Sequence, residues 1–109
     1  AVQESKTGRV LMIASVNQEA LNKAIDSGLA TFWSTSRNQL WTKGETSGDY
    51  LKLDEFLIDC DQDALVFKVT LAGNGVCHTY DKKGVHRLSC FYRKFDNQSK
   101  TLRFLEGDK

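Results

Sequence analysis

The segment Tyr50–Leu71, YLKLDEFLIDCDQDALVFKVTL, carries the features from which the fold is predicted. Its two ends, YLKLDEFLI and LVFKVTL, are rich in β-branched, aromatic and other apolar residues, as strands usually are. The acidic stretch DCDQDA, Asp59–Ala64, lies between them. The segment therefore predicts two strands separated by an acidic connection.

Shorter strand patterns lie on both sides of this segment. They are VQESKTGRVLMIAS, read as two strands around a turn at Gly8, then LATFWSTS, CFYRKF and TLRFL, the last two around a turn at DNQSK. The stretch RNQLWTKGETSGD is polar and contains glycines, and it predicts an irregular connection with one large aromatic residue.

One helix is predicted over residues 18–27. Asn17 is a candidate N-cap, and Glu19 would place a negative charge at the positive end of the helix dipole. Gly28 stands where the helix should stop. Apolar residues recur at helical spacing, at Ala20, Leu21, Ala24 and Ile25. The predicted fold class is α+β, mostly β, in a single domain over residues 1–109.

The composition is that of a soluble globular domain, with 40% hydrophobic and 27% charged residues among 109. The net charge of +1 argues against a non-specific nucleic-acid binder. The longest apolar run, Val10–Ala14, is far shorter than the roughly 20 residues that cross a bilayer. Three cysteines without a visible export signal favour reduced thiols and a cytoplasmic location.

The acidic stretch admits more than one interpretation. On an extended segment its three carboxylates would point to one side and Cys60 to the other. The oxygens would suit a hard cation such as Mg²⁺, and the sulfur would suit Zn²⁺. An EF-hand is excluded, because the sixth and twelfth loop positions lack the required glycine and glutamate. A solvated turn remains the alternative. The carboxylates are Asp59, Asp61 and Asp63.

Two further cysteines give the sulfur of Cys60 partners. Together with Cys77 and Cys90 it could supply the three protein ligands of a catalytic zinc site. No C-x-x-C pair exists, which excludes a zinc finger and a zinc deaminase. His78 could move a proton there, although a surface or packed histidine is the alternative. For His86 that structural interpretation is favoured.

The loop TKGETSG, Thr42–Gly48, is a candidate anion site. Its two glycines let the backbone approach a ligand, and Lys43, Thr46 and Ser47 offer donors for a phosphate. The spacing does not match a Walker A loop. An ordinary polar turn remains the alternative.

Taken together and in this order, the stretches GRVLMIASVNQEAL, FWSTSRNQLWTKGETSG, DCDQDAL, CHT and SCFYR resemble the phosphoribosyl-AMP cyclohydrolase family of histidine biosynthesis. The resemblance extends from Val2 to Arg93. It implies a hydrolase that opens the adenine ring of 1-(5-phosphoribosyl)-AMP at the N1–C6 bond and yields a phosphoribosyl-formimino-aminoimidazole-carboxamide ribotide. It also implies a small, distorted barrel-like sheet in an intertwined homodimer.

The resemblance further implies roles for individual residues. Zinc would be bound by Cys60, Cys77 and Cys90, with Cys60 supplied by the partner subunit, and His78 would be the catalytic proton shuttle. Magnesium would be bound by Asp59, Asp61 and Asp63. The substrate-binding candidates are Trp33, Ser34, Ser36, Arg37, Trp41, Lys43, Glu45, Thr46 and Ser47.

The chain departs from the family pattern between its second and third cysteines. Twelve residues separate Cys77 from Cys90, more than is usual in the family, and they include Lys82, Lys83 and His86. We expect this longer segment to form a loop at the edge of the site. Family members also have residues before the position of Ala1, so we expect the N-terminus to be incomplete. A zinc-stabilised dimer without activity is the alternative function.

Overall fold

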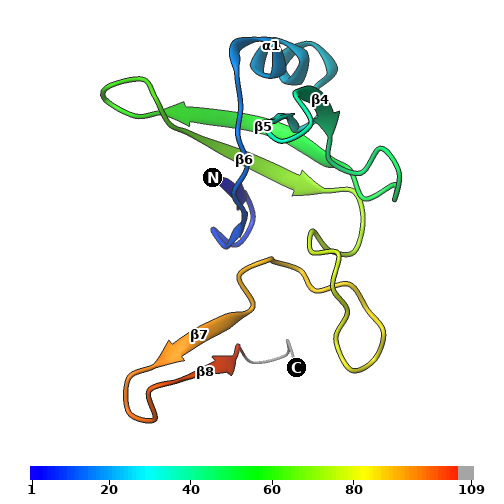
Figure 1. Ribbon diagram of the computed structural model, residues 1–109. Coiled ribbons are helices and arrows are strands. Elements are labelled where there is room, and N and C mark those ends of the chain that lie inside the picture. Colours follow the sequence, from blue (N-terminus) through cyan, green and yellow to red (C-terminus); the bar gives the residue numbers. More distant parts are fainter. Residues whose placement is uncertain (106–109) are drawn as a thin grey trace.

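The computed structural model describes residues 1–105, which are mostly β with one helix (Figure 1). The helix is too short and polar to cross a membrane, and the described residues contain no other. The elements in chain order are β1 (Val2–Glu4), β2 (Val10–Met12), α1 (Gln18–Ser27), β3 (Thr31–Ser34), β4 (Gln39–Thr42), β5 (Leu51–Ile58), β6 (Leu65–Leu71), β7 (Arg93–Asp96) and β8 (Thr101–Phe104).

The largest sheet has four strands in the order β2-β1-β6-β5. Strand β5 pairs with β6 in antiparallel fashion, as the alternating pattern on both sides of the acidic stretch suggests. Strand β1 is an interior strand, antiparallel to β2 and parallel to β6, with Val2 opposite both Met12 and Phe67. The first strand of the chain therefore joins two hairpins into one sheet.

The barrel-like closure that the resemblance implies is not found within residues 1–105, where the sheet is open with β2 and β5 at its edges. The strands that follow β6 in the described part of the chain, β7 and β8, pair with each other and do not bridge those edges. Instead an irregular segment covers part of β2, because the Cys90 amide donates to the Leu11 carbonyl (2.8 Å) and the Ser89 hydroxyl to the Val10 carbonyl (2.7 Å). These contacts satisfy the edge of β2 without a further strand.

The predicted helix is confirmed with its predicted ends. The Asn17 side chain accepts a hydrogen bond from the Ala20 amide (2.9 Å), which satisfies a donor that the first turn leaves unpaired. Gly28 ends the helix with φ 73° and donates to the Ala24 carbonyl (2.9 Å). Ala20 and Ala24 are fully buried and form the face that packs towards the core.

Strand β4 falls in the stretch that the sequence predicts to be irregular, so that prediction is wrong for Gln39–Thr42. The strand pairs with β3 through a turn at Asn38, which adopts φ 54°. The Trp41 ring packs against Phe32 with 4.8 Å between centroids, and burial of these two rings stabilises the hairpin. Phe32 in turn contacts Phe67 of β6 (5.9 Å), which places β3 against the central sheet.

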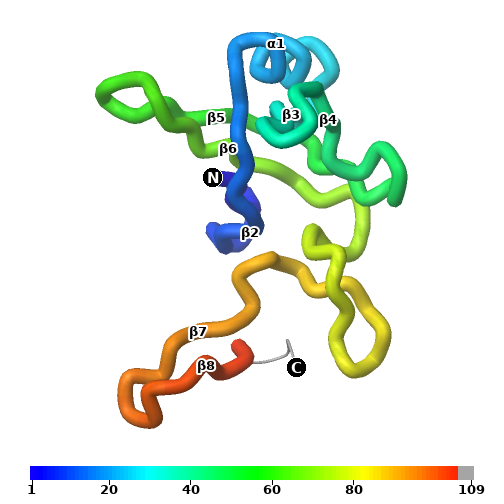
Figure 2. The backbone as a smooth tube through the Cα atoms, viewed as in Figure 1, coloured from blue at the N-terminus to red at the C-terminus, as the bar shows by residue number. Residues whose placement is uncertain are grey.

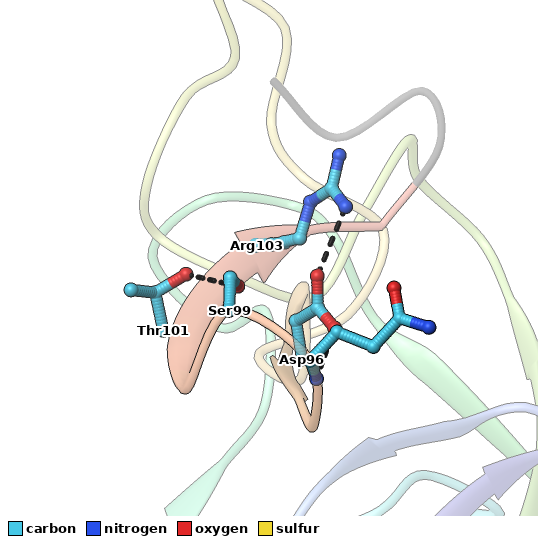
Figure 3. Close-up of polar contacts among 5 residues, drawn as sticks. Asp96, Ser99, Thr101 and Arg103 are labelled. Atoms are coloured by element: carbon cyan, nitrogen blue, oxygen red, sulfur yellow. Dashed lines mark hydrogen bonds and ion pairs between the residues drawn. The ribbon is translucent and has the colours of Figure 1, made fainter.

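The C-terminal strands β7 and β8 are confirmed as a hairpin, and they pair only with each other within the described residues. Figures 1 and 2 show this hairpin standing away from the central sheet. Consistent with that, the radius of gyration is 14.9 Å, whereas a compact chain of this length is expected to have about 13 Å. Near its turn, Arg103 pairs with Asp96 (3.0 Å), and the Ser99 and Thr101 hydroxyls are hydrogen bonded (Figure 3).

Candidate active site and metal ligands

The acidic stretch forms a tight turn between β5 and β6, which agrees with the turn interpretation rather than with the extended one. One oxygen of Asp59 accepts hydrogen bonds from the backbone amides of Asp63 (3.0 Å) and Ala64 (3.1 Å), which curls the chain back on itself. Gln62 completes the turn with φ 63°. The curl nevertheless brings Asp59, Asp61 and Asp63 together, because one oxygen of each lies within 4.8 Å of the others.

The close carboxylates of this turn perturb one another. Hydrogen bonds with Asp61 and Asp59, together with the negative charge of Asp59, raise the pKa of Asp63. Desolvation acts to raise the pKa of Asp59, but hydrogen bonds with the Ala64 amide and the two neighbouring carboxyls lower it overall. A cation bound here would relieve the repulsion between the carboxylates. An exposed set of oxygen donors suits a hard cation such as Mg²⁺.

Cys77 and Cys90 meet in the irregular region that follows β6. Cys77 is buried, and its sulfur contacts the Thr79 hydroxyl (2.9 Å) and the Thr79 amide (3.5 Å). Cys90 lies close enough to Cys77 for each thiol to influence the pKa of the other. Since Cys90 is also tied to β2 through its backbone amide, the sheet fixes the position of the pair.

The two thiols differ in acidity. Burial acts to raise the pKa of Cys77, but hydrogen bonds from Thr79 and Cys90 and the charge of Arg87 lower it overall. Burial and the neighbouring Cys77 raise the pKa of Cys90, with Lys43 acting in the opposite direction. Cys77 is therefore the more acidic thiol of the two. Two neighbouring cysteine sulfurs provide two of the ligands that a zinc ion prefers.

Cys60 does not join this pair within one chain. It is exposed in the acidic turn at one end of β6, whereas Cys77 follows the other end. The seven residues of β6 span about 20 Å, and Figure 2 shows the turn and residues 77–90 on opposite sides of the molecule. Within residues 1–105 the three aspartates are the only group of three or more His, Cys, Asp or Glu side chains close enough to share an ion. One chain thus presents two of the three predicted zinc ligands.

A cleft of about 280 Å³ lies beside the thiol pair. Its walls are the loop after β4 and the chain around Cys77. Eight of the residues singled out in the sequence line it together. They are Arg37, Trp41, Lys43, Glu45, Thr46, Ser47, Cys77 and His78.

The other three substrate-binding candidates do not line this cleft. The Ser34 hydroxyl accepts a hydrogen bond from the Arg37 amide (3.2 Å) and lies 3.4 Å from the Ser36 hydroxyl. These serines therefore shape the turn between β3 and β4 that carries Arg37. The backbone amide of Trp33 donates to the Ser15 carbonyl (2.8 Å), which ties β3 to the segment before α1.

Sequence reasoning missed Asp49, Gly75 and Val76 of the cleft. Thr42 and Gly44 lie in the loop predicted as an anion site, and His86, for which a structural role was favoured, also lines the cleft. Gly44 has φ 93° and packs directly on the backbone of Asp49 and Tyr50, so its role is to close the loop rather than to admit a ligand. A signal for His86 was present in the sequence. The tetrapeptide Asp81–Gly84, DKKG, has aspartate and glycine at the positions that favour a β-turn, which predicts a hairpin returning towards Cys77.

The chemistry of these groups defines a class of site, in which thiol and carboxylate donors for cations lie on the same chain as a polar cleft for an anionic ligand. The family model described as phosphoribosyl-AMP cyclohydrolase matches residues 12–92. The chain therefore belongs to the phosphoribosyl-AMP cyclohydrolase family, whose members are hydrolases.

Proteins of that name from several organisms are similar to this chain. A phosphoribosyl-AMP cyclohydrolase of Hyphomonas neptunium is 52% identical over 94 residues, covering 86% of this chain and 66% of the relative. One from Solibacter usitatus is 50% identical and covers 87% and 71%. One from Methanothrix thermoacetophila is 44% identical and covers 98% and 83%. The similarity thus extends over most of the chain.

Proposed function

We propose that this chain, as one domain, hydrolyses the N1–C6 bond of 1-(5-phosphoribosyl)-AMP, a step of L-histidine biosynthesis. The observation that carries the proposal is the cleft, where Cys77 and His78 lie opposite the loop that contains Lys43, Thr46 and Ser47. Family membership indicates which reaction is catalysed. The cleft contains groups suited to metal binding, phosphate binding and proton transfer.

The thiol pair fits a zinc ion, and Cys77 and Cys90 would hold it with Cys60 of a second copy as the third ligand. Bound there, zinc would supply Lewis-acid chemistry that makes water nucleophilic near neutral pH. The closeness of the two thiols, each of which influences the pKa of the other, supports this assignment, because a zinc ion needs sulfur ligands that lie near one another. Three protein ligands leave one position open for water, as in catalytic zinc sites.

The loop after β4 provides groups for the phosphates of the substrate. Lys43 and Arg37 are cationic, and Thr46 and Ser47 offer hydroxyl donors from the same cleft. Lys43 lies near enough to Cys90 to influence its pKa, so a phosphate or ribose held by this loop would be close to the thiol pair. These contacts would fix the purine ring relative to the attacking water.

His78 is the residue we assign to proton transfer. It is exposed, lines the cleft and directly follows the buried Cys77 in the chain. Water would form a bond to C6 through its oxygen while His78 accepts a proton from it. The N1–C6 bond would then break as the C6 oxygen becomes the carboxamide carbonyl. The same imidazole would return its proton to N1, and the second proton of the water would stay with the opened product. Water is consumed and no oxidant or reductant is needed.

The aspartates of the turn fit a magnesium ion, which Asp59, Asp61 and Asp63 would hold through oxygen. Because Cys60 lies within the same turn, the magnesium of one copy would lie near the zinc of the other. We propose that it stabilises the turn in the form that delivers Cys60 to the neighbouring cleft.

A homodimer is part of the proposal. The separation of Cys60 from the thiol pair within one chain supports it. So does the β7–β8 hairpin, where Phe95 and Leu102 are paired on one face and are 57% and 61% exposed. Apolar faces of that kind are usually covered by another surface. A second copy, held to the first through this face, is the partner we propose; a cytoplasmic location stays a prediction.

The decisive experiment follows ring opening of phosphoribosyl-AMP by its ultraviolet change, for the zinc-replete wild type and for Cys90→Ser. We expect the wild type to turn over and to bind one zinc per subunit. The variant should lose both the turnover and the bound zinc. Thr101→Ser, a change of similar size on the exposed β8 strand, should leave both unchanged. A zinc-replete wild type that forms dimers but shows no turnover would instead support the non-catalytic, zinc-stabilised dimer.

A further inference from the structure

The segment that lengthens the connection between Cys77 and Cys90 is a regular hairpin, which we call the cleft hairpin and define as Thr79–Arg87. Tyr80 and His86 form an antiparallel bridge, and the Asp81 amide donates to the Val85 carbonyl (2.9 Å). At its tip the Gly84 amide donates to the Asp81 carbonyl (3.1 Å), as in a β-turn. The added residues therefore have a defined structure.

The base of the cleft hairpin is fixed beside the thiol pair. The Cys77 amide donates to the Arg87 carbonyl (3.1 Å), and the Arg87 amide donates to the Thr79 carbonyl (3.1 Å). Gly75 lies so close to the carbonyls of His86 and Arg87 that a side chain there would collide with them. Close backbone packing thus determines where His86 lies.

His86 is held in a definite orientation at the cleft. Its Nδ1 is 2.9 Å from the Cys77 carbonyl oxygen, and since a carbonyl can only accept, Nδ1 carries the hydrogen. The Tyr80 ring packs against the imidazole with 4.4 Å between centroids. His86 lines the cleft and Tyr80 does not, so Tyr80 supports the imidazole from behind.

We propose that His86 is a substrate-binding residue that packs against the purine base in the cleft, with Tyr80 as its support. The inference rests on the proposed function, because it assigns the base of the same substrate to a second wall of the same cleft. Trp41, from β4, also lines the cleft, whose loop carries the groups for phosphate. Two planar rings from different elements and a cationic, hydroxyl-rich loop together match a purine nucleotide.

A purely structural role for His86 makes a different prediction from base contact, and two substitutions separate them. His86→Asn keeps a side-chain N–H that can donate to the Cys77 carbonyl but removes the ring. His86→Phe keeps a planar ring that Tyr80 can support but removes the donor. If His86 only fixes the hairpin, asparagine should preserve function and phenylalanine should not. Contact with the base predicts the reverse.

Two measurements test the inference. The first is kcat and KM for ring opening; the second is the Kd for AMP, from quenching of tryptophan fluorescence, in each zinc-replete variant. For His86→Asn we expect KM and Kd to rise about tenfold, while kcat stays within about twofold of the wild-type value. This pattern indicates the loss of a contact that the ground state and the transition state share. His86→Phe should stay close to the wild type. Val85→Ala, an exposed residue of the same hairpin, is the matched control and should change nothing. Equal zinc content in all proteins would show that the thiol pair is intact.

The inference is overturned if His86→Asn leaves both KM and Kd unchanged, or if His86→Phe is as impaired as His86→Asn. Its failure can be told apart from that of the proposed function. A wild type that binds AMP through His86 without opening the ring contradicts the cyclohydrolase activity and leaves the base contact standing. A wild type that opens the ring equally well with asparagine at this position contradicts only the base contact.

Discussion

Asp63 is the member of the acidic turn that most directly reports whether a cation binds there. Its pKa is raised by hydrogen bonds with Asp61 and Asp59 and by the charge of Asp59. At neutral pH the ionised carboxylates repel one another, and no cationic side chain is hydrogen bonded to them in the described contacts. The backbone hydrogen bonds of the turn therefore hold the three carboxylates close together in spite of their repulsion.

We predict that Mg²⁺ raises the melting temperature of the wild type and has little effect on Asp63→Asn. A bound ion stabilises the folded state in proportion to its affinity, and the variant loses one charged ligand. Without added cation, Asp63→Asn should be at least as stable as the wild type, because it removes a repulsion. Thermal unfolding with and without Mg²⁺ measures both effects, with Asp26→Asn on the exposed face of α1 as control. An equal response of wild type and Asp63→Asn would argue against magnesium at this turn.

For single residues, the sequence predicts which side chains have suitable chemistry better than it predicts which of them lie in the cleft. Cys77, His78 and the loop around Lys43 were predicted from residue types and spacing, and they do line one cleft. Trp33 was also a substrate-binding candidate, but it does not line the cleft. The prediction failed because the sequence alone does not show which side of β3 faces the cleft. The place of His86 in the cleft could be predicted only indirectly, from the turn signal of DKKG, because the histidine itself belongs to no motif.

Asp54 links three strands through a β-bulge. It is the unpaired residue between Leu53 and Glu55 in the β5–β6 ladder. The same carboxylate oxygen accepts hydrogen bonds from the Ser5 hydroxyl (2.6 Å), just after β1, and from the Thr70 hydroxyl (2.7 Å) of β6. These hydrogen bonds lower the pKa of Asp54.

We predict that Asp54→Asn lowers the free energy of unfolding by about 0.5–1 kcal/mol at neutral pH, a modest effect because the group is exposed. Since the folded-state pKa lies below the ordinary 3.8, the stabilisation is present above that value and is lost as the pH falls through the lowered pKa. Urea unfolding at pH about 7 and about 3 measures the difference between the proteins. Glu55→Gln is the control, and a difference that is independent of pH would contradict the assignment.

Among the elements, the helix and most strands were predicted because caps, turns and alternation are local signals. Strand β4 was missed because a short strand that pairs only with β3 differs little from a polar loop in composition. The parallel pairing of β1 with β6 leaves no local trace, since both strands have the same apolar pattern in either direction. The open sheet could not be predicted either, because no local pattern shows that an irregular segment, rather than a strand, covers part of β2.

The whole molecule carries its proposed zinc ligands in two places that one chain cannot bring together. We predict that Cys60→Ser and Cys77→Ser, each inactive alone, recover activity when mixed under conditions that exchange subunits. In the mixed dimer, one site combines Cys77 and Cys90 of one chain with Cys60 of the other. Random exchange should restore about one quarter of the wild-type activity, since half of the dimers are mixed and each has one intact site.

The matched control mixes Cys77→Ser with Cys90→Ser. Both substitutions affect the pair contributed by one chain, so each site of every mixed dimer lacks a ligand and no activity should return. Recovery in this control, or none in a verified mixed dimer of Cys60→Ser with Cys77→Ser, would contradict the shared site.

The parallel pairing of β1 with β6 has a consequence for how the chain folds as it is made. Val2 leaves the ribosome before its partner Phe67, which follows several seconds later at about 5–20 residues per second. During that interval the β1–β2 hairpin exposes an unpaired edge to the solvent and to other nascent chains. Synthesis of β6 ends this interval, so codon changes that slow translation between β2 and β6 should increase aggregation of new protein without altering the finished fold.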